Sequence, residues 1–115
     1  MKRLANAEQA LNSSRLTESR AIYRDLLERG ALSRRLLLRV AEGLYRSRDF
    51  EPALEAFERL GDLGQGEEPY RYYIAVALYE TGRYARAKEV LRSALPFIEI
   101  TPDVARYQAK IEGAG

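Results

Sequence analysis

The sequence contains neither cysteine nor histidine among its 115 residues. The absence of cysteine excludes disulfides and thiolate nucleophiles, and the absence of histidine removes imidazole bases and, together with cysteine, the usual zinc ligands. Catalysis would therefore depend on carboxylate, Lys, Ser or Tyr side chains, but no acidic cluster and no Gly-rich phosphate loop is present. We predict that the chain is not an enzyme and that it has no catalytic residue, cofactor or metal site.

Long apolar runs are also missing. The longest, Leu36–Leu38 and Ile74–Tyr79, are far shorter than the roughly 20 residues that a membrane-spanning helix needs. The first residues carry no apolar stretch of the kind found in secretory signals. We therefore expect no membrane span and a cytoplasmic location, with the alternative that Met1 begins a fragment of a longer protein.

Lysine is scarce, because 16 of the 19 basic residues are arginine and the net charge is only +2. Arginine favours bidentate recognition of carboxylate or phosphate groups. The simpler explanation of this preference is a GC-rich genome, and we expect a bacterial one. Because a net charge of +2 is too small to indicate nucleic-acid binding, we expect nucleic acid not to be the partner. The remaining composition is that of one ordinary globular domain.

The chain contains an internal repeat. Residues 37–60 match residues 71–94 at a spacing of 34 residues, with large side chains opposite large ones and small opposite small. A fainter copy lies another 34 residues earlier, which makes three units at about 1–32, 33–66 and 67–100. A degenerate first unit is expected, because a terminal repeat has a neighbour on one side only. The clearest matches are Leu44 with Leu78, Phe50 with Tyr84, Ala53 with Ala87, and Tyr23 with Phe57 and Leu91.

Each unit has the spacing of two helices. Leu37, Val40 and Leu44 share one helical face, and a second periodic stretch runs over residues 50–60 after a short break. We predict an antiparallel helix–turn–helix hairpin for every unit. Thr101 and Pro102 are typical of a helix start, so residues 102–112 are expected to form a single helix that covers the third hairpin. Residues 113–115 are expected to be a flexible tail.

Residues 72–95, which read YYIAVALYETGRYARAKEVLRSAL, resemble a tetratricopeptide repeat. They carry small residues or Gly where the family favours them, although the second unit has Arg48 in place of the turn glycine. The resemblance covers essentially residues 2–112. It implies an all-α, right-handed solenoid of three antiparallel hairpins plus one terminal helix, seven helices in one domain over residues 1–112. The matching positions are Ala75, Gly82, Tyr84, Ala87 and Ala94.

The resemblance also implies a concave face lined mainly by the first helix of each hairpin. We predict that this groove binds a peptide or a partner helix, so that the chain acts as a non-catalytic protein-interaction scaffold. Its tyrosines would be rigid anchors and its arginines would favour acidic groups. The predicted groove residues are Arg35, Leu38, Arg39, Glu42, Tyr45, Arg46, Tyr72, Tyr73, Val76 and Tyr79, continued by Leu4, Glu8, Leu11 and Asn12 in the first unit.

Several alternatives remain open at this stage. Some of these tyrosines, above all Tyr73, could pack between repeats instead. Some members of the family clamp the C-terminal carboxylate of heat-shock chaperones, but the matching positions here contain a single cation, Arg39, so that activity is disfavoured. A single-stranded RNA-binding repeat is the next alternative, although three repeats are few for reading bases. The last is self-association through the repeat ends, which would give a homo-oligomer.

Overall fold

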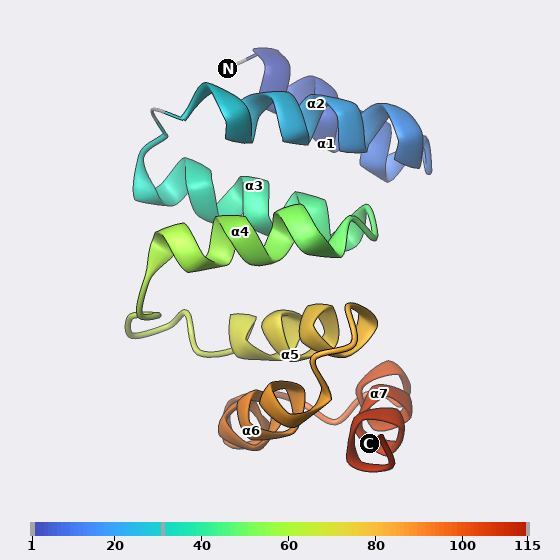
Figure 1. The fold of residues 1–115 in the computed structure, drawn as a ribbon. Helices are drawn as coiled ribbons and strands as arrows, with labels where there is room; N and C mark the ends of the chain where they lie inside the picture. Colours follow the sequence, from blue (N-terminus) through green and yellow to red (C-terminus); the bar gives the residue numbers. More distant parts are fainter. Residues whose placement is uncertain (1, 31, 115) are drawn as a thin grey trace. The chain divides into compact units, whose positions relative to one another are not determined.

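The computed structural model describes residues 2–30 and 32–114, and within them all regular secondary structure is helical (Figure 1). The predictions of an all-α fold and of seven α-helices are confirmed for these residues. None of the described helices is long and apolar enough to cross a membrane. The elements are α1 (Lys2–Asn12), α2 (Leu16–Arg29), α3 (Arg34–Arg46), α4 (Phe50–Leu60), α5 (Tyr70–Glu80), α6 (Tyr84–Ala94), the 3-10 turn η1 (Leu95–Phe97) and α7 (Pro102–Glu112).

Consecutive helices pair as hairpins: α1 with α2, α3 with α4, and α5 with α6. The chain divides into two compact units, of which the first ends at Gly61 and the second begins at Asp62. In the first unit, α3 packs not only against α4 but also against α1 and α2. In the second, α7 packs against both α5 and α6. The first unit therefore contains two hairpins, and the second contains one hairpin and a single helix.

The turn inside each hairpin has the same backbone geometry. Ser14, Arg48 and Gly82 lie 34 residues apart and have φ angles of 61°, 60° and 84°. The amide of the following residue reaches back to a carbonyl in the last helical turn, which is the closing bond of a Schellman motif. The 34-residue repeat is thus present in the backbone of the degenerate first repeat, residues 1–32, as well. The closing bonds are Arg15 N to Ala10 O (2.8 Å), Asp49 N to Leu44 O (2.9 Å) and Arg83 N to Leu78 O (2.8 Å).

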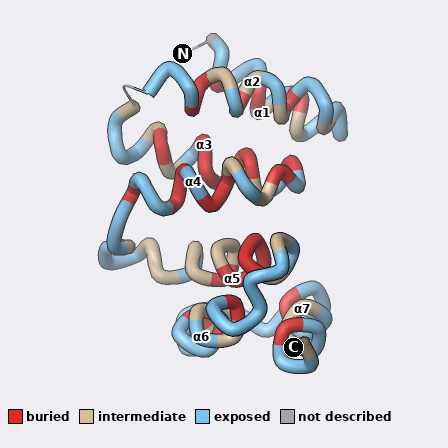
Figure 2. Tube along the Cα trace, in the orientation of Figure 1, coloured by how far each residue is buried: buried red, intermediate tan, exposed pale blue. Residues whose placement is uncertain are grey.

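Burial follows the same period, as the buried inner faces of the helices in Figure 2 show. In the first helix of each hairpin an alanine is wholly buried, and in the second helix a serine or alanine is wholly buried. These small residues let the paired helices approach closely, and larger apolar side chains one turn away fill the remaining space. The core therefore lies inside each hairpin. The small positions are Ala7, Ala41 and Ala75, then Ser19, Ala53 and Ala87.

Helix α7 matches the burial pattern of the repeat on one face only. Ile111 is in register with Gly43 and Ala77, and it is wholly buried. Glu112 is exposed, although it stands where Leu44 and Leu78 turn toward the second helix of their hairpins. A polar outer face of this kind is what a terminal helix of a stack needs for solubility. The predicted bounds of 102–112 match α7.

The two ends of α7 are closed by local hydrogen bonds. The Thr101 hydroxyl accepts a hydrogen bond from the Val104 amide at 3.2 Å, which is the predicted N-cap. At the other end, the amides of Gly113 and Ala114 donate to carbonyls of the last helical turns. Of the predicted tail, Gly115 lies outside the described residues.

Candidate functional site

Six of the predicted groove residues line one cavity of about 330 Å³. Its walls come from the first helices of two neighbouring hairpins, α1 and α3, and its floor comes from α2. The cavity therefore lies where the resemblance to tetratricopeptide repeats puts the binding face. The predicted residues that it brings together are Glu8, Leu11 and Asn12 from α1, and Arg39, Glu42 and Arg46 from α3.

A second hollow of about 540 Å³ lies between the same two helices, toward the beginning of α3. Leu4 and Ala5 form its α1 side, and Arg35 and Leu36 lie on its α3 side. Arg39 lines both hollows. We refer to these two hollows, which have Arg39 in common, as the α1–α3 groove.

Arg39 is held in place by an ion pair with Glu8. One terminal nitrogen of its guanidinium group lies 2.7 and 2.8 Å from the two Glu8 carboxylate oxygens, and Nε lies 3.2 Å from one of them. These hydrogen bonds raise the pKa of Arg39 above its ordinary value. Glu8 therefore neutralises the cation that the sequence analysis offered to an acidic partner. A looser pair, Arg46 with Glu42 at 3.8 Å, borders the first hollow.

Arg35 differs from the other groove arginines. It is exposed on the first turns of α3, and no hydrogen bond or ion pair joins its guanidinium to another described residue. Its charge is consequently available to a ligand in the second hollow. Leu36, which is partly exposed, supplies apolar surface beside it, whereas the predicted groove residue Leu4 is 2% exposed.

Two residues of this site were missed by the sequence analysis. A Cβ atom at Gly43 would lie 2.1 Å from Cζ of Tyr23, so only glycine lets the tyrosine ring of α2 lie against α3. Tyr23 is 1% exposed and lines the floor of the 330 Å³ hollow. A glycine inside a helical pattern indicates a close backbone approach, and Gly43 was the signal that could have revealed the contact.

The Tyr23 hydroxyl has an unusual environment. Burial, and next to it the charge of Glu8, raise the pKa of Tyr23 to about 12. The hydroxyl makes no hydrogen bond with any residue that the structure describes. Since none of the described side chains has an enclosed polar atom without a partner, the hydroxyl must open into the hollow. It is a hydrogen-bonding group at the bottom of the groove that no side chain satisfies.

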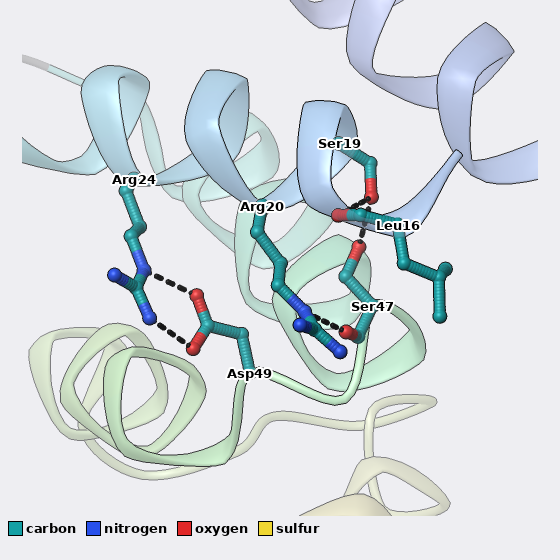
Figure 3. A network of polar contacts seen from close by, with 6 residues as sticks. All are labelled: Leu16, Ser19, Arg20, Arg24, Ser47 and Asp49. Carbon is teal, nitrogen blue, oxygen red and sulfur yellow. Dashed lines mark hydrogen bonds and ion pairs between the residues drawn. The ribbon is translucent and has the colours of Figure 1, made fainter. Parts of the chain in front are cut away.

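A buried polar network holds α2 beside the α3–α4 turn (Figure 3). The Ser19 and Ser47 hydroxyls are 2.7 Å apart, and Nε of Arg20 donates to the Ser47 carbonyl at 2.6 Å. Arg24 donates two hydrogen bonds, of 2.5 and 2.6 Å, to the buried carboxylate of Asp49. Because these contacts join the two hairpins, they also fix Tyr23, which lies on the same helix, against Gly43.

In the second unit two predicted groove residues are buried, because Val76 is 1% exposed and Tyr72 is 8% exposed. Their role in a groove stays a prediction. Conversely Ile74, which the repeat places on the inward face, is partly exposed. The physical reason is that α5 is apolar on almost every side, so the pattern alone could not tell which stripe is buried.

The remaining aromatic groove residues already have aromatic neighbours. The Tyr73 ring lies 5.5 Å from that of Tyr70, which is on the same helix, so this contact does not test whether Tyr73 packs between repeats. Tyr79 lies 5.6 Å from Tyr84 and 6.3 Å from Tyr107. In the first unit Leu38 and Tyr45 are partly buried, and the Tyr45 ring lies 6.0 Å from that of Phe50. Their role as ligand anchors stays a prediction.

Comparison with known proteins points to one group of relatives. Human intraflagellar transport protein 70B is 33% identical over 102 residues, which is 89% of this chain and 15% of the relative. The mouse proteins 70A2 and 70B are 35% identical over 80 residues, which is 70% of the chain and 12% of each relative. The chain thus spans about one-seventh of the length of the curated relatives it matches. No family model and no solved structure matches it.

These relatives bear on two expectations. Their names refer to intraflagellar transport and mention no catalysed reaction. All are mammalian, so they give no support to a bacterial source.

Within the described residues, no group of three or more acidic side chains is arranged to hold a metal ion.

Proposed function

We propose that the chain is a helical-repeat module of the tetratricopeptide type that binds a peptide or a partner helix in the α1–α3 groove, without catalysis. The observation that carries the proposal is the pair of hollows that meet at Arg39. Their walls are the first helices of adjacent hairpins, so both the repeat register and the polar network stabilise the spacing of the groove. A groove that is formed before binding loses little conformational entropy when a ligand enters it.

The proposed ligand places an acidic side chain beside Arg35. The guanidinium of Arg35 has no carboxylate of its own among the described residues, and it lies in the first turn of α3, where the helix dipole also favours negative charge. Arg39 is less suited to this role, because Glu8 already occupies its hydrogen-bonding edge. The acidic contact is thus confined to one end of the groove.

The biological setting proposed for this module is a protein assembly like that of its relatives. Because the similarity to intraflagellar transport protein 70B extends over 89% of the chain, the module is proposed to supply a protein contact within an intraflagellar transport assembly, in the cytoplasm or the flagellum. The tagged chain, expressed in ciliated cells, should then co-purify with intraflagellar transport proteins. Recovery of none of them would contradict the setting and leave the groove to be tested separately.

The groove is tested with a library of random peptides displayed on phage and selected on the purified chain. The best peptide should shift the NMR signals of α1 and α3, and Arg35→Glu should weaken its binding about tenfold through loss and reversal of one charge contact. Arg86→Glu is the matched control, since Arg86 is also exposed but lies on α6. Selection of no peptide, or signal changes confined to α2 and α4, would overturn the proposal.

A further inference from the structure

The first hollow of the groove contains a hydrogen-bonding group that the fold leaves unused. Tyr23 is 1% exposed, it lines the hollow, and its hydroxyl bonds to no described residue. The side chain of Asn12, which also lines the hollow, likewise makes no hydrogen bond with another described residue. A ligand group that enters here meets the Tyr23 hydroxyl, which can both donate and accept a hydrogen bond, and the side-chain amide of Asn12.

The charges around the hollow disfavour a charged ligand group. Glu8 is paired with Arg39, and Glu42 with Arg46, so that no net charge is left to balance an incoming ion. Burial and the Glu8 charge disfavour the Tyr23 phenolate more than Arg46 favours it, and they would act in the same way on a carboxylate at the floor. An ammonium or guanidinium group would have to pass Arg39 and Arg46.

An apolar ligand group is disfavoured for a different reason. It would cover the Tyr23 hydroxyl and exclude water from it without replacing the lost hydrogen bond. Burying an unpaired hydroxyl in this way is unfavourable, and sites built to hydrogen-bond a ligand discriminate strongly against analogues that lack the group. The group that fits is therefore uncharged and both donates and accepts hydrogen bonds.

We infer that the hollow over Tyr23 takes the carboxamide side chain of an asparagine or glutamine in the bound peptide, with the Tyr23 hydroxyl and Asn12 as its partners. This inference rests on the proposed function, because the peptide has to lie in the α1–α3 groove. We infer a side chain, and not the peptide backbone, because Tyr23 is only 1% exposed and a narrow group is needed to reach its hydroxyl. Gly43 contributes by leaving the space that the Tyr23 ring occupies.

The test uses the peptides selected from the same display library. The selection is repeated on Tyr23→Phe, which removes only the hydroxyl and should fold, and on Tyr84→Phe as a control that removes a tyrosine hydroxyl elsewhere. Peptides selected on the parent and on Tyr84→Phe should share a fixed Asn or Gln. That preference should disappear on Tyr23→Phe.

A selected peptide with glutamine at the fixed position is then compared with versions that carry methionine or glutamate at that position. Together with the Tyr23→Phe protein, these peptides provide a thermodynamic cycle. On the parent, the change of glutamine to methionine should weaken binding about three- to tenfold, which is the range of one neutral hydrogen bond. On Tyr23→Phe the two peptides should bind alike. The glutamate version should bind the parent less tightly than the glutamine version does.

Each other outcome has a definite meaning. If peptides are selected but show a fixed acidic, basic or apolar residue at this position, the carboxamide inference is wrong and the groove proposal stands. If Tyr23→Phe weakens all peptides equally, a backbone contact replaces the inferred side chain. If no peptide is selected on any of the three proteins, the groove proposal itself fails, and the inference fails with it.

Discussion

The two units of the molecule are stabilised in different ways. In the first, hydrogen bonds and ion pairs join separate helices: Arg3 with Asp25, Arg24 with Asp49 and Arg39 with Glu8. In the second, the contacts between elements include aromatic pairs and cation–π contacts, such as Tyr79 with Tyr107 and Arg71 over Phe97. The ion pair of Arg106 with Asp103 in this unit lies within a single helix.

The contrast matters because directional polar contacts and apolar packing constrain the geometry of neighbouring helices to different degrees. Charge-assisted hydrogen bonds are geometrically specific, so they suit a unit that must hold two hairpins at the spacing of a groove. Aromatic contacts tolerate more variation in angle and distance. We therefore expect the first unit to respond to salt and to polar substitutions, and the second to respond mainly to changes of apolar volume.

The largest effects should be the same in both units. Leu44 and Leu78 occupy the same repeat position and are almost wholly buried. Leu44→Ala and Leu78→Ala should each lower the free energy of unfolding by about 2–5 kcal/mol, since each loses apolar contacts and leaves a cavity. Urea denaturation measures both, and a loss smaller than the stated range for only one of them would show that the two hairpin cores are not equivalent.

Substitutions of Asp49 and Arg83 should change the free energy of unfolding by different amounts in the two units. They share a repeat position just after the turn, but Asp49 is buried against Arg24 and Arg83 is exposed. Asp49→Ala should lower the free energy of unfolding by about 1.5–3 kcal/mol, because a charge-assisted pair is lost. Arg83→Ala should change it by less than about 0.5 kcal/mol. Urea unfolding at low and high salt is the measurement, and equal effects of the two variants would remove the contrast.

Gly43 tests the close contact between α2 and α3. Gly43→Ala should cost about 1–3 kcal/mol, because the new methyl group overlaps the Tyr23 ring. Tyr23→Leu, which introduces the residue found at the same repeat position in α6, should recover part of that loss in the double variant. A Gly43→Ala protein as stable as the parent would show that the tyrosine ring moves aside without cost.

The hairpin turns should give the smallest effects, and with opposite signs. Gly82→Ala should destabilise the second unit by about 1 kcal/mol, because alanine is disfavoured at the φ angle of 84°. Ser14→Gly should stabilise the first unit by a few tenths of a kcal/mol, because it relieves the same strain at a cost in chain entropy. Thermal unfolding of both variants against the parent gives the two signs, and two shifts in the same direction would contradict the shared turn geometry.

Much of the architecture follows from the sequence alone. The 34-residue period predicted the three hairpins, and the Thr101–Pro102 pair predicted the start of α7. The same period placed Arg39, Glu42 and Arg46 on one face with residues of α1, and the structure gathers them around one hollow. These predictions succeed because helical periodicity and turn chemistry are local properties that depend on residues only a few positions apart.

Only the tertiary structure decided which apolar stripe of α5 is buried, that Glu8 neutralises Arg39, and that the Tyr23 hydroxyl opens into the groove. Each depends on a residue from another helix: Arg39 meets Glu8 from α1, and Gly43 meets Tyr23 from α2. A one-dimensional pattern shows that a helix has a face, but the identity, distance and charge of what lies against that face are set by how neighbouring helices pack. The sequence determined the repeat and its groove-forming helices, and the packing of α1, α2 and α3 determined the chemistry of the groove.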